Sequence, residues 1–566
     1  GSGYPRPVPS DLVSRTVRRL RVGLIVDSGG VNTDHGRYQV SALRQCDAVD
    51  LHAVFVQHGV TSAASGPLRQ LRLLVARHGL SRAISRIVFE MTLAIDRWLA
   101  GLLAPSLMTG EPDPVSLADL NQIDLQPTVS SSGHVHRFGE VDLAKVRSSG
   151  CDVLVHLGTG ILRGAILDAV PLGILSFHHG DNRHYRGGPP GYWEVFHRRD
   201  STGWILQRLT DRLDDGIIYR RGATWTQPLA EWNRAYVVAT SARALVELLE
   251  SIAATESPPA PEPLTQPGPL YRFPSGFQAI HGLVKVGTRS AAQIVRKYVA
   301  PRPEWAVLVA AGAWSQPGER SWVALKNPPR TFVADPFVVK EGGQTVVFVE
   351  EFDRVKGRAA IAVYDGSLTS PIRLGTAISE PFHLSFPFVF RFEGDLYMSP
   401  ESWMVEQIRV YRCIEFPLRW ELCHSHLDGH KYVDPMIVSV NGEWTILATP
   451  VDERSGDAHS RLEAFSLGRT PFGAPRMVSR SPVVFDSESA RNGGLVTAGT
   501  SRFRCGQRQG FGMYGEDLRL FEIQECSPTS YREVEVQLPS GLRPSGVRGF
   551  HHLSATEDLT AIDVYR

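Results

Sequence analysis

A short motif recurs at nearly regular intervals through the second half of the chain. FVADPFVV (332–339), HLSFPFVF (383–390) and KYVDPMIV (431–438) lie about fifty residues apart, and ARNGGLVT (490–497) and RGFHHLSA (548–555) stand in similar contexts. The sequence between them consists of short alternating strands separated by turn residues, with hardly any helical pattern. Five units of this length predict a propeller with one four-stranded blade per unit.

The ends of this region predict how such a ring would close. The last strand, LTAIDVYR (559–566), could pair with the first, near WAVLVAAG (305–312). We therefore expect residues 304–566 to form an all-β five-bladed propeller.

The first half has a different pattern. Apolar β-branched runs at Val22 to Val26, 49–59 and 151–158 alternate with helical segments, which is typical of a parallel sheet with crossover helices. The glycine turn after the first run does not match GxGxxG, so a dinucleotide site is not favoured. We expect an α/β domain over residues 4–254.

Two further segments have the patterns of a linker and of helices. Residues 255–303 begin as a proline-rich stretch, predicted to be an extended linker, and continue into an amphipathic helix at about 276–299. Residues 67–105 have apolar side chains at helical spacing and many arginines. They predict one or two helices packed on the body, with a membrane-surface helix as the alternative.

Composition narrows the classes of partner and compartment. The 566 residues carry a net charge of +1, which does not indicate nucleic acid as a partner. The six cysteines are scattered without a CxxC pair, so we expect neither a zinc ribbon nor a disulfide scaffold, and we expect a cytoplasmic location. No apolar run reaches the length of about 18 residues that a membrane span needs.

A polar, turn-rich segment follows the strand that ends the sheet pattern. LSFHHGDNRHYRGGPPGYWEVF (175–196) suggests an active site at the carboxyl end of a parallel sheet. Its histidines and carboxylate would suit zinc or iron, but an acceptor pocket or polar loop is favoured and we predict no metal. A nucleophile–base–orienter set of Ser176, His178 and Asp214 is a further alternative.

The same segment resembles the core of the folate-dependent formyltransferases. The matching residues are His178, then Tyr185-Arg186-Gly187, then Leu213-Asp214-Asp215-Gly216, and the resemblance covers roughly residues 20–250. It implies a Rossmann-like fold with His178 and Asp214 as catalytic residues. Ser176 takes the place of the family's asparagine, since residues two apart on a strand face the same way.

The resemblance also implies a cofactor and an acceptor site. The cofactor would be 10-formyltetrahydrofolate, and the acceptor a primary amine on a sugar or a secondary metabolite. The cofactor would lie against Gly158, Thr159, Gly160, Ile161, Leu162, Arg163, Leu209 and Leu213. The acceptor would meet His179, Asp181, Asn182, Tyr185 and Arg186.

The second half resembles the five-bladed arabinanase-like glycosidases and the module found in glucosamine inositolphosphorylceramide transferases. Asp335, Ser385 and Asp434 would occupy equivalent positions at the mouth of the central channel. Two carboxylates there could cleave a glycosidic bond or bind sugar hydroxyls, or the Asp-Pro pairs could simply shape turns. The further residues expected to bind a polar ligand are Glu350, Glu401, Arg504, Gln507 and Tyr514.

Taken together, the sequence predicts an N-formyltransferase whose propeller binds or positions the acceptor. Because Ser176 replaces the family's asparagine, a different folate or acyl reaction is an alternative. A non-catalytic carbohydrate-binding protein is the second alternative.

Overall fold

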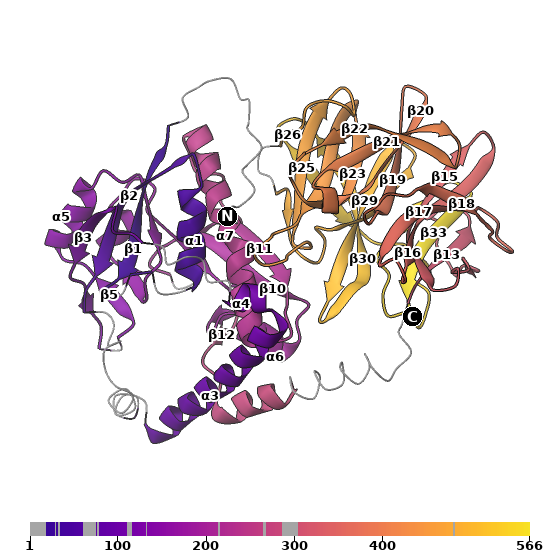
Figure 1. Cartoon of the computed structure of the whole chain (residues 1–566). Helices are drawn as coiled ribbons and strands as arrows, with labels where there is room; N and C mark the ends of the chain where they lie inside the picture. Colours follow the sequence, from indigo (N-terminus) through magenta and orange to yellow (C-terminus); the bar gives the residue numbers. More distant parts are fainter. Residues whose placement is uncertain are drawn as a thin grey trace. The chain divides into compact units, whose positions relative to one another are not determined.

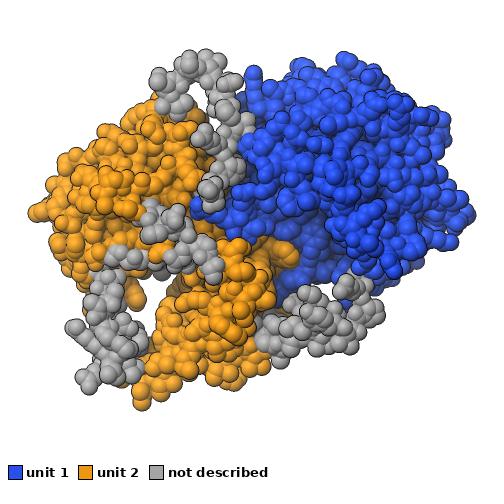
Figure 2. Space-filling view, viewed as in Figure 1, with its two compact units in different colours: residues 1–11, 299–566 blue, residues 12–298 orange. Residues whose placement is uncertain are grey.

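The protein divides into two compact units. In this computed structural model, one unit comprises Leu12–Tyr298 and the other comprises Val299–Arg566 with Gly1–Asp11 (Figure 2). The structure describes residues 18–28, 30–31, 34–59, 75, 79–109, 116–131, 133–212, 216–263, 266, 268–285, 304–478 and 482–566.

The first unit is built on a seven-stranded, mainly parallel sheet, which confirms the predicted α/β class. Its strands run in the order β11-β10-β8-β6-β1-β2-β3, and only β10 and β11 are antiparallel to their neighbours. Apolar side chains bury both faces of the central strands, as in Val22, Leu24 and Ile25 of β1. The strands are β1 (Leu20–Asp27), β2 (Val49–Gln57), β3 (Asn121–Leu125), β6 (Val153–His156), β8 (Ile174–His178), β10 (Ser201–Arg208) and β11 (Ile217–Trp225).

Helices and a small second sheet complete this unit (Figure 1). The long helix α7 is buried along most of its length, whereas α3 buries only one face, including Phe89 and Ala100. No helix among the described residues is long and apolar enough to cross a membrane. The helices are α1 (Asp34–Arg44), α3 (Leu80–Leu103), α4 (Pro105–Thr109), α5 (Glu140–Ser148), η1 (Ala165–Asp168), α6 (Tyr192–His197) and α7 (Ala230–Thr255), and the small sheet joins β4 (Thr128–Val129), β5 (Val135–Arg137) and β7 (Ile161–Arg163).

The proline-rich segment is not a free linker. Its short strand β12 (Leu270–Tyr271) pairs in parallel with β9 (Arg186–Gly187), and the Gly268 amide donates to the carbonyl of Asn182. Extended proline-rich backbone keeps its other amides and carbonyls available, so it can pair with an exposed edge. Residues 276–285 are helical, and residues 286–303 of the predicted helix lie outside the described residues.

The second unit consists of five antiparallel sheets, one for each predicted blade. Four of them have four strands, and the third adds a short fifth strand, β27 (Val484–Phe485), beside β25 (Arg461–Gly468). The fifth sheet combines both ends of the unit, because Trp305 of β13 pairs with Tyr565 of β33 and Ala311 with Leu559. This confirms the predicted closure. The blades are β15 (Thr331–Glu341) to β18 (Arg373–Ile378), β19 (Ser385–Phe392) to β22 (Arg419–His426), β23 (Tyr432–Val440) to β26 (Arg476–Met477), β28 (Asn492–Ala498) to β31 (Tyr531–Val536), and β32 (Leu553–Ala555), β33 (Leu559–Tyr565), β13 (Trp305–Ala311) and β14 (Val323–Ala324).

The recurring motifs all lie at the strand that begins a blade: β15, β19, β23, β28 and β32. The first four share an irregular register at the same point of the motif, as at Ala334/Phe337. Asp335, Phe386 and Asp434 stand there with φ near +47°, the left-handed region that few non-glycine residues adopt. Phe386, not Ser385, is therefore equivalent to the two aspartates.

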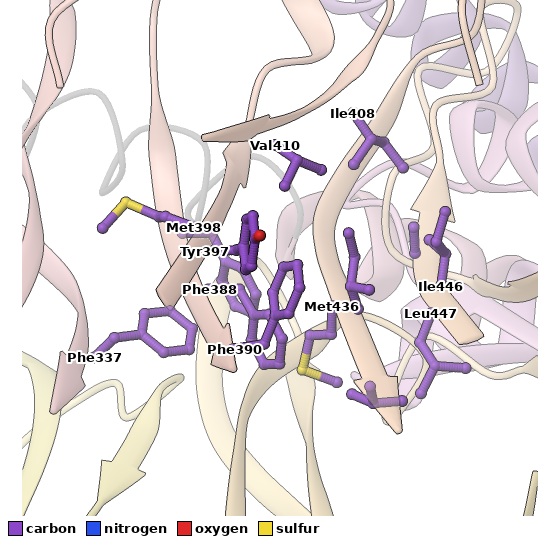
Figure 3. Close-up of a cluster of buried hydrophobic side chains, with 14 of the residues drawn as sticks. Phe337, Phe388, Phe390, Tyr397, Met398, Ile408, Val410, Met436, Ile446 and Leu447 are labelled. Carbon is purple, nitrogen blue, oxygen red and sulfur yellow. The ribbon is translucent and has the colours of Figure 1, made fainter. Parts of the chain in front are cut away.

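Large apolar side chains fill the space between neighbouring blades. Phe337 of β15, Phe388 of β19 and Met436 of β23 belong to one buried cluster that also includes Met398 and Leu447 (Figure 3). The alternation of each strand sends one set of side chains into this packing. The packed blades hold the bulged ends of their first strands in place, where the polar groups gather.

Candidate functional site

Four carboxyl groups lie close together at the inner strands of the propeller. Asp335 and Asp434 stand at the bulges of β15 and β23, while Glu350 of β16 (Gln344–Asp353) and Glu401 of β20 (Asp395–Glu401) come from the second strands of two blades. Their exposed fractions are only 2–9 %. Burying several carboxyl groups together costs free energy unless each has a hydrogen-bond or ion-pair partner.

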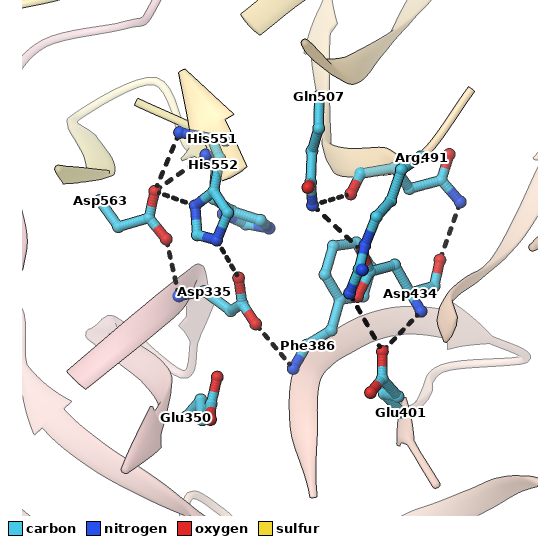
Figure 4. Close-up of polar contacts among 12 residues, drawn as sticks. Asp335, Glu350, Phe386, Glu401, Asp434, Arg491, Gln507, His551, His552 and Asp563 are labelled. Carbon is cyan, nitrogen blue, oxygen red and sulfur yellow. Dashed lines mark hydrogen bonds and ion pairs between the residues drawn. The ribbon is translucent and has the colours of Figure 1, made fainter. Parts of the chain in front are cut away.

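One arginine joins two of these acids. The Nε of Arg491 donates to Oδ2 of Asp434 over 2.5 Å, and its terminal nitrogen lies 3.8 Å from Oε2 of Glu401 (Figure 4). The amide of Asp434 donates to the same Glu401 oxygen over 3.0 Å. The left-handed turn at Asp434 thus lets both its backbone and its side chain take part.

A histidine lies between two other aspartates. Oδ1 of Asp563 accepts a hydrogen bond from Nδ1 of His551 over 2.7 Å, while Nε2 of His551 lies 3.8 Å from Oδ1 of Asp335. Asp563 also accepts the amides of His552 and Asp335. The ring of Trp305 stacks on His551 with centroids 3.8 Å apart. Because Asp563 and Trp305 belong to β33 and β13, ring closure builds this side of the site.

We call Asp335, Glu350, Glu401, Asp434, Arg491, His551 and Asp563 the acidic centre. Burial, followed by the neighbouring carboxylates, raises the pKa of Glu350 well above its usual value, and the same causes act on Glu401. Burial also raises the pKa of Asp335 to about 7, although His551 opposes the rise. Nε2 of His383 also lies 3.5 Å from Oε1 of Glu350. The five carboxyl groups of the centre therefore outnumber Arg491, His551 and His383, which leaves a surplus of acid.

Three members of the acidic centre have the composition of a metal site. Ligand atoms of Asp335, His551 and Asp563 all lie within 4.8 Å of one another. Nδ1 of His551 and both oxygens of Asp563 are already engaged in hydrogen bonds. These hydrogen bonds account for the arrangement of the three side chains, and Nε2 of His551 is the ring nitrogen that faces Asp335.

The other propeller residues predicted to bind a ligand divide into two groups. Gln507 donates to Oδ2 of Asp434 over 3.1 Å, and Tyr514 lies beside Arg491 and His551, so both border the acidic centre. Arg504 does not, because its fully buried guanidinium forms a two-bonded ion pair with Glu533 of β31. Its observed role is to join strands within one blade.

Sequence reasoning missed four residues of this region. Arg491, His551 and His552 lie within the last two recurring motifs, which lack the Asp-Pro pair that drew attention to the first and third. The recurrence of the motif was the available signal, and His551 stands at the position of Asp335. Asp563 had no local signal, because its role depends on closure of the ring.

In the first unit, the predicted catalytic residues are engaged locally. The hydroxyl of Ser176 donates to the adjacent carbonyl of Phe177 over 3.3 Å. A ring nitrogen of His178 lies 3.0 Å from the carbonyl oxygen of Tyr185. Asp214 and Leu213 lie outside the described residues.

The predicted cofactor residues form structure around β7. The amide and hydroxyl of Thr159 both donate to Asp27, between Gly158 and Gly160, and Arg163 donates to the carbonyl of Thr210. Ile161–Arg163 form β7 itself, with Leu162 in the core and Leu209 packed against that core. In the structure these residues therefore form β7 and the contacts that hold it.

The predicted acceptor residues contact other parts of the first unit. His179 lies 3.1 Å from Ser241 of α7, and Asp181 forms ion pairs with Arg183 and Arg221. Arg221 also donates to the amide oxygen of Asn182. The hydroxyl of Tyr185 lies 3.0 Å from Nδ1 of His197, and Arg186 belongs to β9.

Comparison with known proteins finds a family that matches most of the second unit. Residues 321–551 match the family model described as glucosamine inositolphosphorylceramide transferase 1, N-terminal. The chain is 31% identical over 240 residues to glucosamine inositolphosphorylceramide transferase 1 of Oryza sativa subsp. japonica, covering 40% of this chain and 32% of the relative. The Arabidopsis thaliana protein of the same name is 33% identical over 254 residues, covering 42% and 32%. The chain thus spans about a third of the length of these curated relatives.

Solved structures show weaker likenesses. An exo-beta-1,3-galactanase from Phanerochaete chrysosporium has a TM-score of 0.32 and 15% identity, covering 38% of this chain and 56% of that one. Glycinamide ribonucleotide transformylase 1 from Symbiobacterium toebii has a TM-score of 0.27 and 15% identity, covering 42% and 89%. Neither likeness supports a functional conclusion.

These findings correct the functional prediction. The matching family and its relatives are named glucosamine inositolphosphorylceramide transferases, so the prediction of an N-formyltransferase with 10-formyltetrahydrofolate as cofactor is wrong. The motif that carried the prediction was short, and the described part of it shows Ser176 and His178 in local hydrogen bonds. The resemblance of the second half to the glucosamine inositolphosphorylceramide transferase module agrees with the comparison.

Proposed function

We propose that this protein is a sugar transferase whose acidic centre binds an amino sugar. The observation that carries the proposal is the surplus of buried carboxyl groups at the inner strands. All members of the acidic centre except Asp563 lie within the segment that matches the transferase family. The relatives' name also contains glucosamine, an amino sugar.

The electrostatics explain why a cationic sugar suits the centre. Burial raises the pKa of Asp335, Glu350 and Glu401 most, and repulsion between the ionised carboxyls adds to the rise. An ammonium group among them would offset that repulsion, and its three N–H donors would match carboxylate acceptors. A neutral sugar would satisfy the hydroxyl contacts but not the surplus charge.

The same groups could carry the chemistry of glycosyl transfer. The bond from the anomeric carbon to the leaving oxygen breaks, a bond to the acceptor oxygen forms, and one proton moves on each side. Glu401, whose pKa is raised by burial, would give its proton to the leaving oxygen. Asp335, with a pKa near 7, would accept the proton of the attacking hydroxyl.

Calorimetric titration with glucosamine, glucose and N-acetylglucosamine tests the proposal. We expect glucosamine to bind at least about tenfold more tightly than the two neutral sugars, and to release protons because its charge lowers the carboxyl pKa values. Repeating the titration in buffers of different ionisation enthalpy measures that release. Glu401→Gln should weaken glucosamine binding, whereas Glu557→Gln, at an exposed glutamate, should not.

Two outcomes would contradict the proposal. Equal affinity for glucosamine and glucose would show that the carboxyl groups do not recognise the ammonium group. Undiminished glucosamine binding by Glu401→Gln would place the amino group elsewhere.

A further inference from the structure

The first unit carries a concentrated apolar surface on α3. One face of this helix packs into the unit, but an opposite stripe is exposed and includes Met91 and Trp98, with exposed fractions of 63% and 65%. The other exposed members are Leu80, Ile84, Ile87, Ile95, Leu102 and Leu103. The spacing of three and four residues keeps them on one side of the helix.

A second helical segment extends this surface. Residues 276–285 run beside α3, with Gly276 next to Ser85 and the Arg86 guanidinium 3.7 Å from the centre of the Phe273 ring (Figure 1). Their exposed apolar side chains are Phe273, Phe277, Ile280 and Val284. Together the two segments hold half of the large apolar side chains exposed on the described part of the chain. A patch this concentrated marks a binding surface.

The charged side chains on these two segments indicate what kind of partner binds the apolar surface. The charged side chains at their surface are Arg82, Arg86, Arg97, Arg272 and Lys285. Glu90 pairs with Arg86 and Glu231 of α7 pairs with Arg97, so cations outnumber carboxylates by five to two. A second copy of the chain would bring the same cations against one another, because a two-fold interface joins identical patches. An anionic surface would instead complement them.

We propose that the exposed face of α3 and residues 273–284 binds the surface of an anionic lipid bilayer. The apolar side chains would enter the boundary between headgroups and acyl chains, with Trp98 at that boundary and the cations at the phosphates. Because the opposite face of α3 is buried in the unit, the helix lies along the bilayer. This inference does not depend on the proposed sugar transfer.

Pelleting of the full chain with vesicles tests the proposal. The probes are vesicles of phosphatidylcholine alone and of phosphatidylcholine mixed with phosphatidylglycerol. We expect binding to the anionic vesicles, and the double variant Met91→Ser/Leu102→Ser should reduce the partition coefficient by about a hundredfold, or tenfold for each exposed side chain removed. Met404→Ser/Leu422→Ser removes a methionine and a leucine with exposed fractions of 53% and 50% from the propeller and should leave binding unchanged.

The alternatives give distinct results. Failure of the wild-type chain to pellet with anionic vesicles would overturn the proposal. If sedimentation then showed a dimer that Met91→Ser/Leu102→Ser dissociates, the face would be an interface between copies. Equal pelleting by both double variants would also overturn it, because binding would not use this face.

Discussion

At the scale of single residues, the acidic centre depends on backbone that ordinary side chains avoid. Asp335 and Asp434 hold φ values near +47°, and the amide of each donates a hydrogen bond to a carboxylate, that of Asp563 and that of Glu401 respectively. A left-handed residue costs about 1–3 kcal/mol unless the surroundings determine it. Here the acceptors of those bonds are members of the acidic centre itself, so the geometry of the site and the strained backbone support one another.

The first prediction concerns the charge on His551. Burial alone would lower the pKa of this imidazole, but Asp563 and Asp335 raise it above its usual value. Asp563→Asn should therefore lower that pKa by about one unit or more. Protonated imidazole quenches a stacked indole, so the pH titration of fluorescence, taken as wild type minus Trp305→Phe, reports His551.

Two controls keep this test specific. Asp558→Asn, at an exposed neighbour of the same strand, should leave the midpoint unchanged. His551→Gln should abolish the transition. Since folding raises the pKa of His551, its contribution to stability is full below the unfolded pKa of about 6.5 and is lost as pH rises through the folded value. A midpoint that did not move in Asp563→Asn would contradict the proposed interaction.

At the scale of elements, ring closure is the contact on which the propeller depends most. The strands β13 and β33 pair along seven residues although they lie at opposite ends of the unit. Ala306 and Val564 are direct partners in this ladder. Opposite residues on antiparallel strands lie close enough for a disulfide.

The second prediction uses that pairing. The double variant Ala306→Cys/Val564→Cys should form a disulfide that closes a loop of more than 250 residues. Oxidised protein should be more stable than reduced protein by about 2–4 kcal/mol, measured by calorimetry with and without reductant. The single variant Ala306→Cys should show no difference between the two conditions. A double variant that stays reduced under oxidant would mean that the strands are not neighbours.

Elements also show what sequence could predict. The motif around Asp335 allowed the first strand of each blade to be predicted, because a proline at a bulge and alternating apolar residues can be recognised from the local sequence. Closure could be predicted because both ends read as strands. The pairing of Leu270 with Arg186 could not, since it depends on which sheet edge is open in the folded unit. The role of Arg491 was hidden because its motif has glycines where the others have Asp-Pro.

At the scale of the whole molecule, the two units have separate cores and separate electrostatic features. The acidic centre lies wholly in the propeller, while the first unit buries an unrelated acid, Glu194 of α6. Its Oε1 has no hydrogen-bond partner among the described residues. Burial raises the pKa of Glu194 to about 8. The stability of each unit should therefore respond to a different set of groups.

The third prediction tests this separation. The folded first unit binds the Glu194 proton more tightly than the unfolded chain does, so its stability should fall by about 1.4 kcal/mol per pH unit between the unfolded pKa and about 8. Glu194→Gln removes that dependence and should raise the melting temperature of one calorimetric transition at pH 8. The other transition should instead respond to the disulfide between positions 306 and 564. Glu256→Gln, at an exposed glutamate just after α7, serves as the control and should shift neither. A single transition that responds to both changes would show that the two units unfold together.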